Sequence, residues 1–186
     1  MKQDLEGKVV TKDKLKITVQ PKTKKELEDI IKKTIEEKGD SCDLNFIDTS
    51  LITDMSELFL RSSFNGNISK WDTSNVENMR KMFTSSKFNG YISDWNTSNV
   101  VDMSRMFMTS DFEGDTSKWN TSNVKDMSEM FCGSRFDGDI SKWDISKWKV
   151  SKDALVCGMF ERTYLEEDNN LPDWYVHHSN KKDMFY

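Results

Sequence analysis

Carboxylate and amide side chains recur along this chain at a fixed step of 24 residues. They form the series Asp48, Asp72, Asn96, Asn120 and Asp144. Carboxylates gathered in one column could work as an acid–base pair or bind calcium. The same side chains also shape turns, because they accept hydrogen bonds from nearby backbone N–H groups. We expect turn formation to be their main role, and contact with a partner remains the alternative.

A serine lies two residues after each member of that column, at Ser50, Ser74, Ser98, Ser122 and Ser146. A serine nucleophile needs an oriented base within hydrogen-bond reach. The two histidines, His177 and His178, lie together near the end of the chain and have no carboxylate at a telling spacing. Because each serine precedes a predicted short helix, we expect these serines to be helix caps. The sequence therefore predicts no catalytic residue and a non-enzymatic protein.

Metal and cofactor sites are not indicated by the sequence either. Cys42, Cys132 and Cys157 lie far apart, and no Cys-x-x-Cys or Cys/His ligand spacing occurs. The glycines do not form a phosphate-binding loop. We expect the cysteines to be reduced thiols that serve as small apolar residues, and we predict neither a metal nor a cofactor.

Charge and hydrophobicity narrow the classes of partner. The formal net charge is −5 and lysine far outnumbers arginine, which argues against direct nucleic-acid binding. No run approaches the ~20 consecutive apolar residues of a membrane span. The first residues, MKQDLEGKVVTKDKLK, contain no apolar segment of a secretory signal. We therefore expect a cytoplasmic protein without membrane contact.

The elements that must position these side chains belong to an internal repeat. Aromatic, methionine and glycine residues keep the same 24-residue step as the acidic column. The tryptophan series is Trp71, Trp95, Trp119 and Trp143, and the first phenylalanine series is Phe59, Phe83, Phe107 and Phe131. Such a period is typical of repeat architectures, in which each unit buries its apolar side against its neighbours.

One unit divides into two patterns. Ile68, Trp71 and Thr73 follow the L-x-x-L-x-L strand pattern of leucine-rich repeats, and Val76 to Phe83 carry an apolar stripe at helical spacing. Ser74 and Glu77 match a capping box at the start of this helix. The predicted fold is therefore α/β: a leucine-rich-repeat-like, right-handed solenoid of strand, short helix and turn. A parallel sheet would form one side and helices the other, with the tryptophan and methionine columns in the core.

The same frame predicts the domain organisation. We expect a single domain over residues 1–186, with an N-terminal cap (1–43), regular repeats (44–143) and an irregular C-terminal repeat and cap (144–186). Thr23-x-x-Glu26 indicates the start of a capping helix that continues to about Lys38. The predicted strands lie at 17–19, 44–49, 68–73, 92–97, 116–121, 140–145 and 171–176.

Positions that vary from unit to unit are free of packing and can be adapted to a partner. They mix charged residues with exposed aromatic ones, which is typical of protein-binding surfaces. We predict that a monomer binds a protein partner through the strand face. An alternative is a small acidic inhibitor of a nucleic-acid-processing enzyme. The candidate contact residues are Phe46, Asp48, Lys70, Asp72, Tyr91, Asp94, Asn96, Lys118, Asn120, Lys142 and Asp144.

The recurring phrase Phe-Asn-Gly-x-Ile-Ser-x-Trp-Asp/Asn-Thr-Ser-Asn-Val-x-x-Met-x-x-Met-Phe resembles the repeat of BspA-like bacterial leucine-rich-repeat proteins, which is also common in mycoplasma-type lipoproteins. The resemblance covers residues 44–143 closely. It implies protein–protein contact, often as a surface-displayed adhesin, without a shared enzymatic site. A surface or secreted location is therefore the alternative to the cytoplasm.

Overall fold

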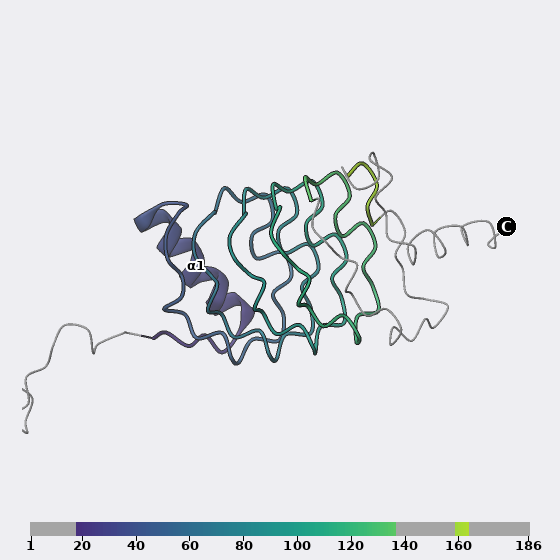
Figure 1. Cartoon of the computed structure of the whole chain (residues 1–186). Coiled ribbons are helices and arrows are strands. Elements are labelled where there is room, and N and C mark those ends of the chain that lie inside the picture. Colours follow the sequence, from purple (N-terminus) through teal and green to yellow (C-terminus); the bar gives the residue numbers. More distant parts are fainter. Residues whose placement is uncertain (1–17, 137–158, 164–186) are drawn as a thin grey trace, which may run out of the picture.

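The computed structural model describes residues 18–136 and 159–163. It contains one α-helix, α1 (Lys24–Lys38), which lies across the N-terminal end of a row of stacked loops (Figure 1). Each loop is one 24-residue unit. In this part of the chain, strand-type pairing is limited to isolated parallel bridges between neighbouring units: Val19–Ile47, Asp43–Asn67, Asp54–Asn78, Asn78–Asp102 and Asp102–Asp126.

The predicted capping helix is confirmed. Thr23 is its N-cap, and the Thr23 side chain accepts a hydrogen bond from the Glu26 N–H at 3.2 Å. At the other end, the Gly39 N–H donates to the Ile35 carbonyl at 2.8 Å. The apolar side of α1 buries Leu27 and Ile31 in the same core as the repeat units. The helix therefore covers apolar side chains that the first unit would otherwise expose.

Within residues 18–136, the predicted strands are not present, and the fold prediction is wrong. Where a strand was expected at 68–73, the chain makes two tight turns. The Trp71 N–H donates to the Ile68 carbonyl at 3.1 Å, and the Val76 N–H donates to the Thr73 carbonyl at 3.0 Å. N–H groups used within such turns cannot pair along a sheet. The segments at 44–49, 92–97 and 116–121 fold alike, and Val19, in the segment predicted at 17–19, forms one bridge. Residue 17 and the segments at 140–145 and 171–176 lie outside the described residues.

The short helices predicted on the opposite side are also wrong. The N–H groups of Met79, Lys81 and Phe83 each donate to a carbonyl of the next unit at 2.9 Å. These N–H groups therefore cannot form the i→i−4 hydrogen bonds of an α-helix. Among the described residues, α1 is the only α-helix. The leucine-rich-repeat-like solenoid, with a parallel sheet facing a layer of helices, is therefore replaced by stacked turns.

Aromatic columns fill the interior of the stack. Adjacent rings of the first phenylalanine column lie nearly parallel, with centroids 5.5 to 5.9 Å apart, through Phe59, Phe83, Phe107, Phe131 and Phe160. Phe160 continues this column although 29 rather than 24 residues separate it from Phe131. The predicted burial of the tryptophan and methionine columns is confirmed at Trp71, Trp95, Trp119, Met55, Met79, Met103 and Met127.

The glycine of the Phe-Asn-Gly motif is required by a close approach. A Cβ atom added at Gly66 would lie 2.0 Å from the Cys42 carbonyl oxygen and 2.6 Å from the Phe64 ring. At Gly90 the same atom would lie 2.8 Å from the Phe88 ring. Glycine therefore lets the backbone pass directly over the buried ring that precedes it.

Candidate functional site

Three of the predicted contact residues meet in one exposed cluster. The Tyr91 hydroxyl donates to Asp94 Oδ2 at 2.8 Å, and Lys118 Nζ donates to Asp94 Oδ1 at 2.8 Å. Tyr91 is 56% exposed, the most exposed large apolar side chain among the described residues. Asp94 and Lys118 occupy the same position in adjacent units, so stacking places them side by side. We call these three residues the Tyr91 cluster.

The electrostatics of the Tyr91 cluster follow from its two hydrogen bonds. Donation from Lys118, and then from Tyr91, lowers the pKa of the Asp94 carboxyl. The hydrogen bond to Asp94 raises the pKa of both Tyr91 and Lys118. At neutral pH the tyrosine is therefore neutral, the carboxylate is charged, and the lysine is charged. The aromatic ring is held in place but still faces solvent.

The acidic and amide column shapes turns, as predicted. The Oδ1 atoms of Asp72 and Asn96 accept hydrogen bonds from the backbone N–H of Ser74 and Ser98, at 2.9 and 3.1 Å. Asp48 and Asn120 make the same contact one unit before and one unit after this pair. The prediction that the serines cap helices is wrong, because turns follow them in the described units. A role of this column in partner contact stays a prediction.

Two further candidates have different surroundings. Phe46 is half-buried and packs against the core, with the Lys38 ammonium of α1 5.4 Å from the centre of its ring. It is therefore a less accessible anchor than the sequence suggests. Lys70 is exposed, and its backbone N–H donates to Asn45 Oδ1 at 2.7 Å. Lys142 and Asp144 lie outside the described residues.

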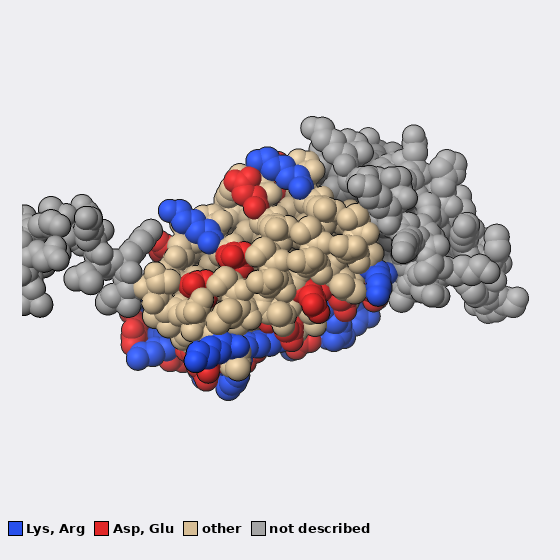
Figure 2. Space-filling view, turned by 90° about the horizontal axis from the view of Figure 1, so that it is seen from below, with Lys and Arg blue, Asp and Glu red and all other residues tan. Residues whose placement is uncertain are grey.

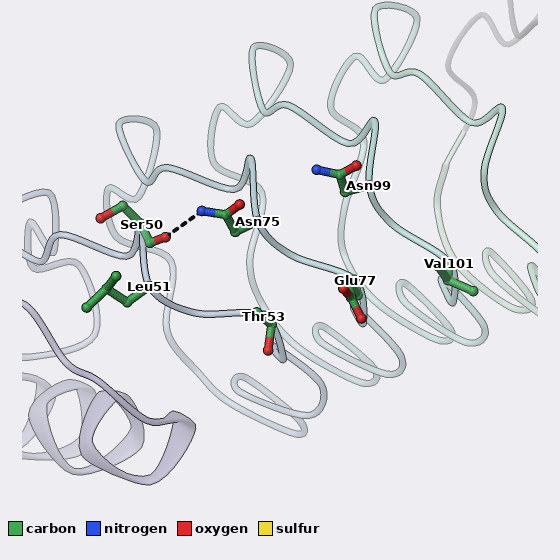
Figure 3. Close-up of a pocket in the computed structure, with 7 residues that line it drawn as sticks. All are labelled: Ser50, Leu51, Thr53, Asn75, Glu77, Asn99 and Val101. Atoms are coloured by element: carbon green, nitrogen blue, oxygen red, sulfur yellow. Dashed lines mark hydrogen bonds between the residues drawn. The ribbon is translucent and has the colours of Figure 1, made fainter.

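A shallow groove that sequence reasoning missed crosses three adjacent units (Figure 3). It has a volume of about 520 Å³ and is lined by Ser50, Leu51, Thr53, Asn75, Glu77, Asn99 and Val101. Leu51 is 51% exposed and stands where the next units carry asparagine. This exchange of an amide for an apolar side chain is the signal in the sequence that could have revealed the groove. We call it the Leu51 groove.

The acidic and thiol side chains of the described residues do not gather into a metal centre. The described residues contain no group of three or more His, Cys, Asp or Glu side chains that could hold a metal ion. Cys42 is a buried free thiol, and burial raises its pKa. No helix in the described ranges is long and apolar enough to cross a membrane.

Charge on the surface is mixed rather than concentrated. Figure 2 shows a face on which acidic and basic side chains lie intermixed along the edges, while most of the central area carries neither. Ion pairs also join opposite charges of adjacent units, such as Lys87–Asp111 at 2.9 Å and Arg105–Glu129 at 3.0 Å. An extended acidic or basic patch is absent from the face in this view.

Comparison with known proteins gives one family. The sequence profile described as "Mycoplasma protein of unknown function, DUF285" matches residues 27–143 and again residues 108–186. This match confirms the predicted mycoplasma-type repeat, but gives no direct support for the leucine-rich-repeat or BspA-like designation. No curated protein and no solved structure matches the chain.

Proposed function

We propose that this chain, which belongs to the DUF285 family, is a non-enzymatic module that binds another protein through the Tyr91 cluster and the exposed positions beside it. The carrying observation is the arrangement of Tyr91 itself. Tyr91 is more than half exposed, while its hydroxyl donates a hydrogen bond to Asp94 at 2.8 Å.

An exposed tyrosine held in one orientation is well suited to be a binding anchor. Tyrosine is enriched among the residues that dominate the energy of protein interfaces. It offers a large contact area and loses little conformational freedom on binding, because only two side-chain torsions have to be fixed. The hydrogen bond to Asp94 and the ion pair of Asp94 with Lys118 restrict the ring before a partner arrives. We therefore infer that Tyr91 is the central contact.

The surroundings of the cluster support the same function. The buried phenylalanine columns keep the same residue type in the described units, whereas the position of Asp94 is Phe46, Lys70 and Lys118 in the other described units. A rigid scaffold thus presents a surface that changes along the stack. The BspA-like resemblance adds the expectation that the partner is a protein, either inside the cell or at its surface.

Photo-crosslinking from position 91 tests this proposal. Benzoylphenylalanine replaces Tyr91 in one variant and the exposed Arg80 in a matched control, and both are irradiated in source-cell lysate and on intact cells. We expect one protein to crosslink from position 91 and not from position 80. Equal or absent crosslinking at both positions would contradict the proposal. A basic nuclease-like partner that is lost at high salt would indicate the acidic-inhibitor function instead.

A further inference from the structure

We propose that the Leu51 groove binds an extended peptide segment of a partner, with a basic side chain between two apolar ones. This inference goes beyond the proposed function, because the groove and the Tyr91 cluster have no residue in common. The occupant is deduced from three properties of the groove: its fixed walls, its apolar ends and the charge between them.

The walls of the groove are fixed by contacts between units. Asn75 Nδ2 donates to the Ser50 carbonyl at 2.8 Å, and Asn99 Nδ2 donates to the Ser74 carbonyl at 2.7 Å. Below them, the Glu77 N–H donates to the Thr53 carbonyl at 2.8 Å. Figure 3 shows these side chains in two rows, with Ser50, Asn75 and Asn99 in one and Thr53, Glu77 and Val101 in the other. A peptide would therefore meet a surface that is already ordered, which lowers the entropic cost of binding.

The two ends of the groove are apolar. Leu51 lies at one end and Val101 at the other (Figure 3). Neither residue type is required by the repeat, since Leu51 aligns with asparagines, and Val101 aligns with Thr53, Glu77 and Lys125. Leu51 exposes half of its surface, so burial against a ligand would remove apolar area from water. The groove thus offers one apolar contact at each end.

A carboxylate lies between these ends. Glu77 is exposed and lines the groove, and it forms no ion pair with another described residue. Elsewhere in the stack, charged residues at matching positions of adjacent units form ion pairs, as Lys81 does with Glu57. An unpaired carboxylate between two apolar contacts favours a ligand that carries a positive charge at its centre.

The size of the groove sets the length of the peptide. Neighbouring units lie ~5 Å apart, so the two steps from the unit of Leu51 to that of Val101 span ~10 Å. The two residues also differ by two positions within their units, which adds to their separation. Four residue steps of an extended chain span about 13 Å and place alternate side chains on one face. The matching sequence is therefore apolar-x-basic-x-apolar.

Fluorescence anisotropy with labelled peptides tests the inference. The probe is Ser-Ser-Leu-Ser-Lys-Ser-Leu-Ser-Ser, compared with versions whose central lysine is glutamine or glutamate. We expect the lysine peptide to bind about fivefold more tightly than the glutamate peptide, as suits one partly exposed ion pair. Glu77→Gln should abolish this preference, whereas Glu113→Gln, at an exposed carboxylate outside the groove, should retain it.

Two further variants test the apolar contacts of the groove and its independence from the Tyr91 cluster. Leu51→Asn introduces the residue of the next units, and should weaken all peptides while leaving the lysine preference intact. Tyr91→Ala should change none of these affinities, so the groove can fail while the Tyr91 cluster holds, or the reverse. Absence of binding at about 1 mM peptide, or a preference unchanged by Glu77→Gln, would overturn the inference.

Discussion

Individual buried side chains in this protein tie each unit to its neighbour. The indole N–H of Trp95 donates to the Ile68 carbonyl at 3.3 Å, across 27 residues of sequence. The Thr97 hydroxyl donates in the other direction, to the Asn120 carbonyl at 3.0 Å. Both contacts recur in the neighbouring units. The repeated residues therefore satisfy buried polar groups as well as fill the core.

Replacement of Trp95 tests this double role. Trp95→Ala should cost about 3–5 kcal/mol of unfolding free energy, because it leaves a cavity in a core where the side chain is 4% exposed. Trp95→Phe keeps most of the ring contacts and removes the N–H donor, so it should cost less. Urea denaturation followed by circular dichroism measures both, with the exposed Lys70→Ala as control. A midpoint unchanged in Trp95→Ala would show that the tryptophan does not support the core.

The Tyr91 cluster makes a prediction about the pKa of Asp94. Tyr91→Phe removes one hydrogen-bond donor, so the pKa of Asp94, lowered in the wild type, should rise toward its ordinary value. Lys118→Met should raise it more, because Lys118 is the larger cause. Because this pKa is lowered by folding, the cluster's contribution is present above the ordinary carboxyl pKa and is lost as pH falls through the lowered value.

NMR titration of the Asp94 carboxyl measures these values directly. Lys33→Met, which removes an exposed lysine of α1, serves as the control and should leave the titration unchanged. An Asp94 pKa that is the same in wild type and in Tyr91→Phe would show that the hydroxyl does not bond to the carboxylate in solution.

At the scale of elements, the described units are built from turns with a row of left-handed residues. Residues with positive φ recur at two positions of the repeat unit. The non-glycine ones are Glu57, Arg61, Lys81, Ser85, Arg105, Thr109, Glu129 and Arg162, and Gly133 takes the second position in the unit of Glu129. Side chains rarely adopt this conformation, and it costs about 1–2 kcal/mol per residue. Hydrogen bonds to the next unit hold it here, as from the Arg61 N–H to the Thr84 carbonyl at 2.8 Å.

Glycine substitution tests this strain. Arg61→Gly removes the Cβ atom at a φ of +56°, so it should raise the unfolding free energy by about 0.5–1 kcal/mol. Arg80→Gly makes the same exchange where φ is not positive, and should lower the unfolding free energy by about 0.5–1 kcal/mol. Thermal or urea unfolding distinguishes the two variants. Loss of stability in both would mean that position 61 is not strained.

These elements explain which parts of the fold could be predicted. The helix α1 was predictable, because Thr23, Glu26 and a 3.6-residue apolar stripe specify a helix locally. The backbone conformation of the repeat units was not predictable. Their buried side chains recur once every 24 residues, and this spacing is compatible with any backbone conformation that stacks one unit on the next. The alternation at Trp71 and Thr73 suggests a strand, yet the Asp72 side chain accepts the Ser74 N–H and closes a turn. Backbone bonding to the next unit decided the conformation.

The candidate site was predictable to a similar degree. Exposed variation identified Tyr91, Asp94 and Lys118, and the 24-residue register was enough to place Asp94 beside Lys118. The hydrogen bond from Tyr91 to Asp94 depends on the conformation of the turn between Phe88 and Trp95. The pattern of residue types does not specify that conformation. The Leu51 groove depends on turn geometry too, although its one exchanged residue was visible in the sequence.

At the level of the whole molecule, charged residues of one described unit are often paired with opposite charges of the next unit, and on the face in Figure 2 they do not gather into a patch of one sign. Opposite charges occupy equivalent positions of neighbouring units in the pairs Glu57–Lys81, Lys87–Asp111, Asp94–Lys118 and Arg105–Glu129. Exposed pairs of this kind add little stability. The net charge of −5 is therefore distributed along a mixed surface, which suits specific contact with a protein.

The most direct test of the central claim is the affinity of the crosslinked partner for wild-type protein and for Tyr91→Ala, measured by calorimetry. If Tyr91 is the central contact, Tyr91→Ala should weaken binding about 30-fold, the effect of a residue that contributes about 2 kcal/mol, without changing the unfolding midpoint. Arg80→Ala should leave the affinity unchanged. Equal affinities for wild type and Tyr91→Ala would contradict the proposal that this protein binds its partner through the Tyr91 cluster.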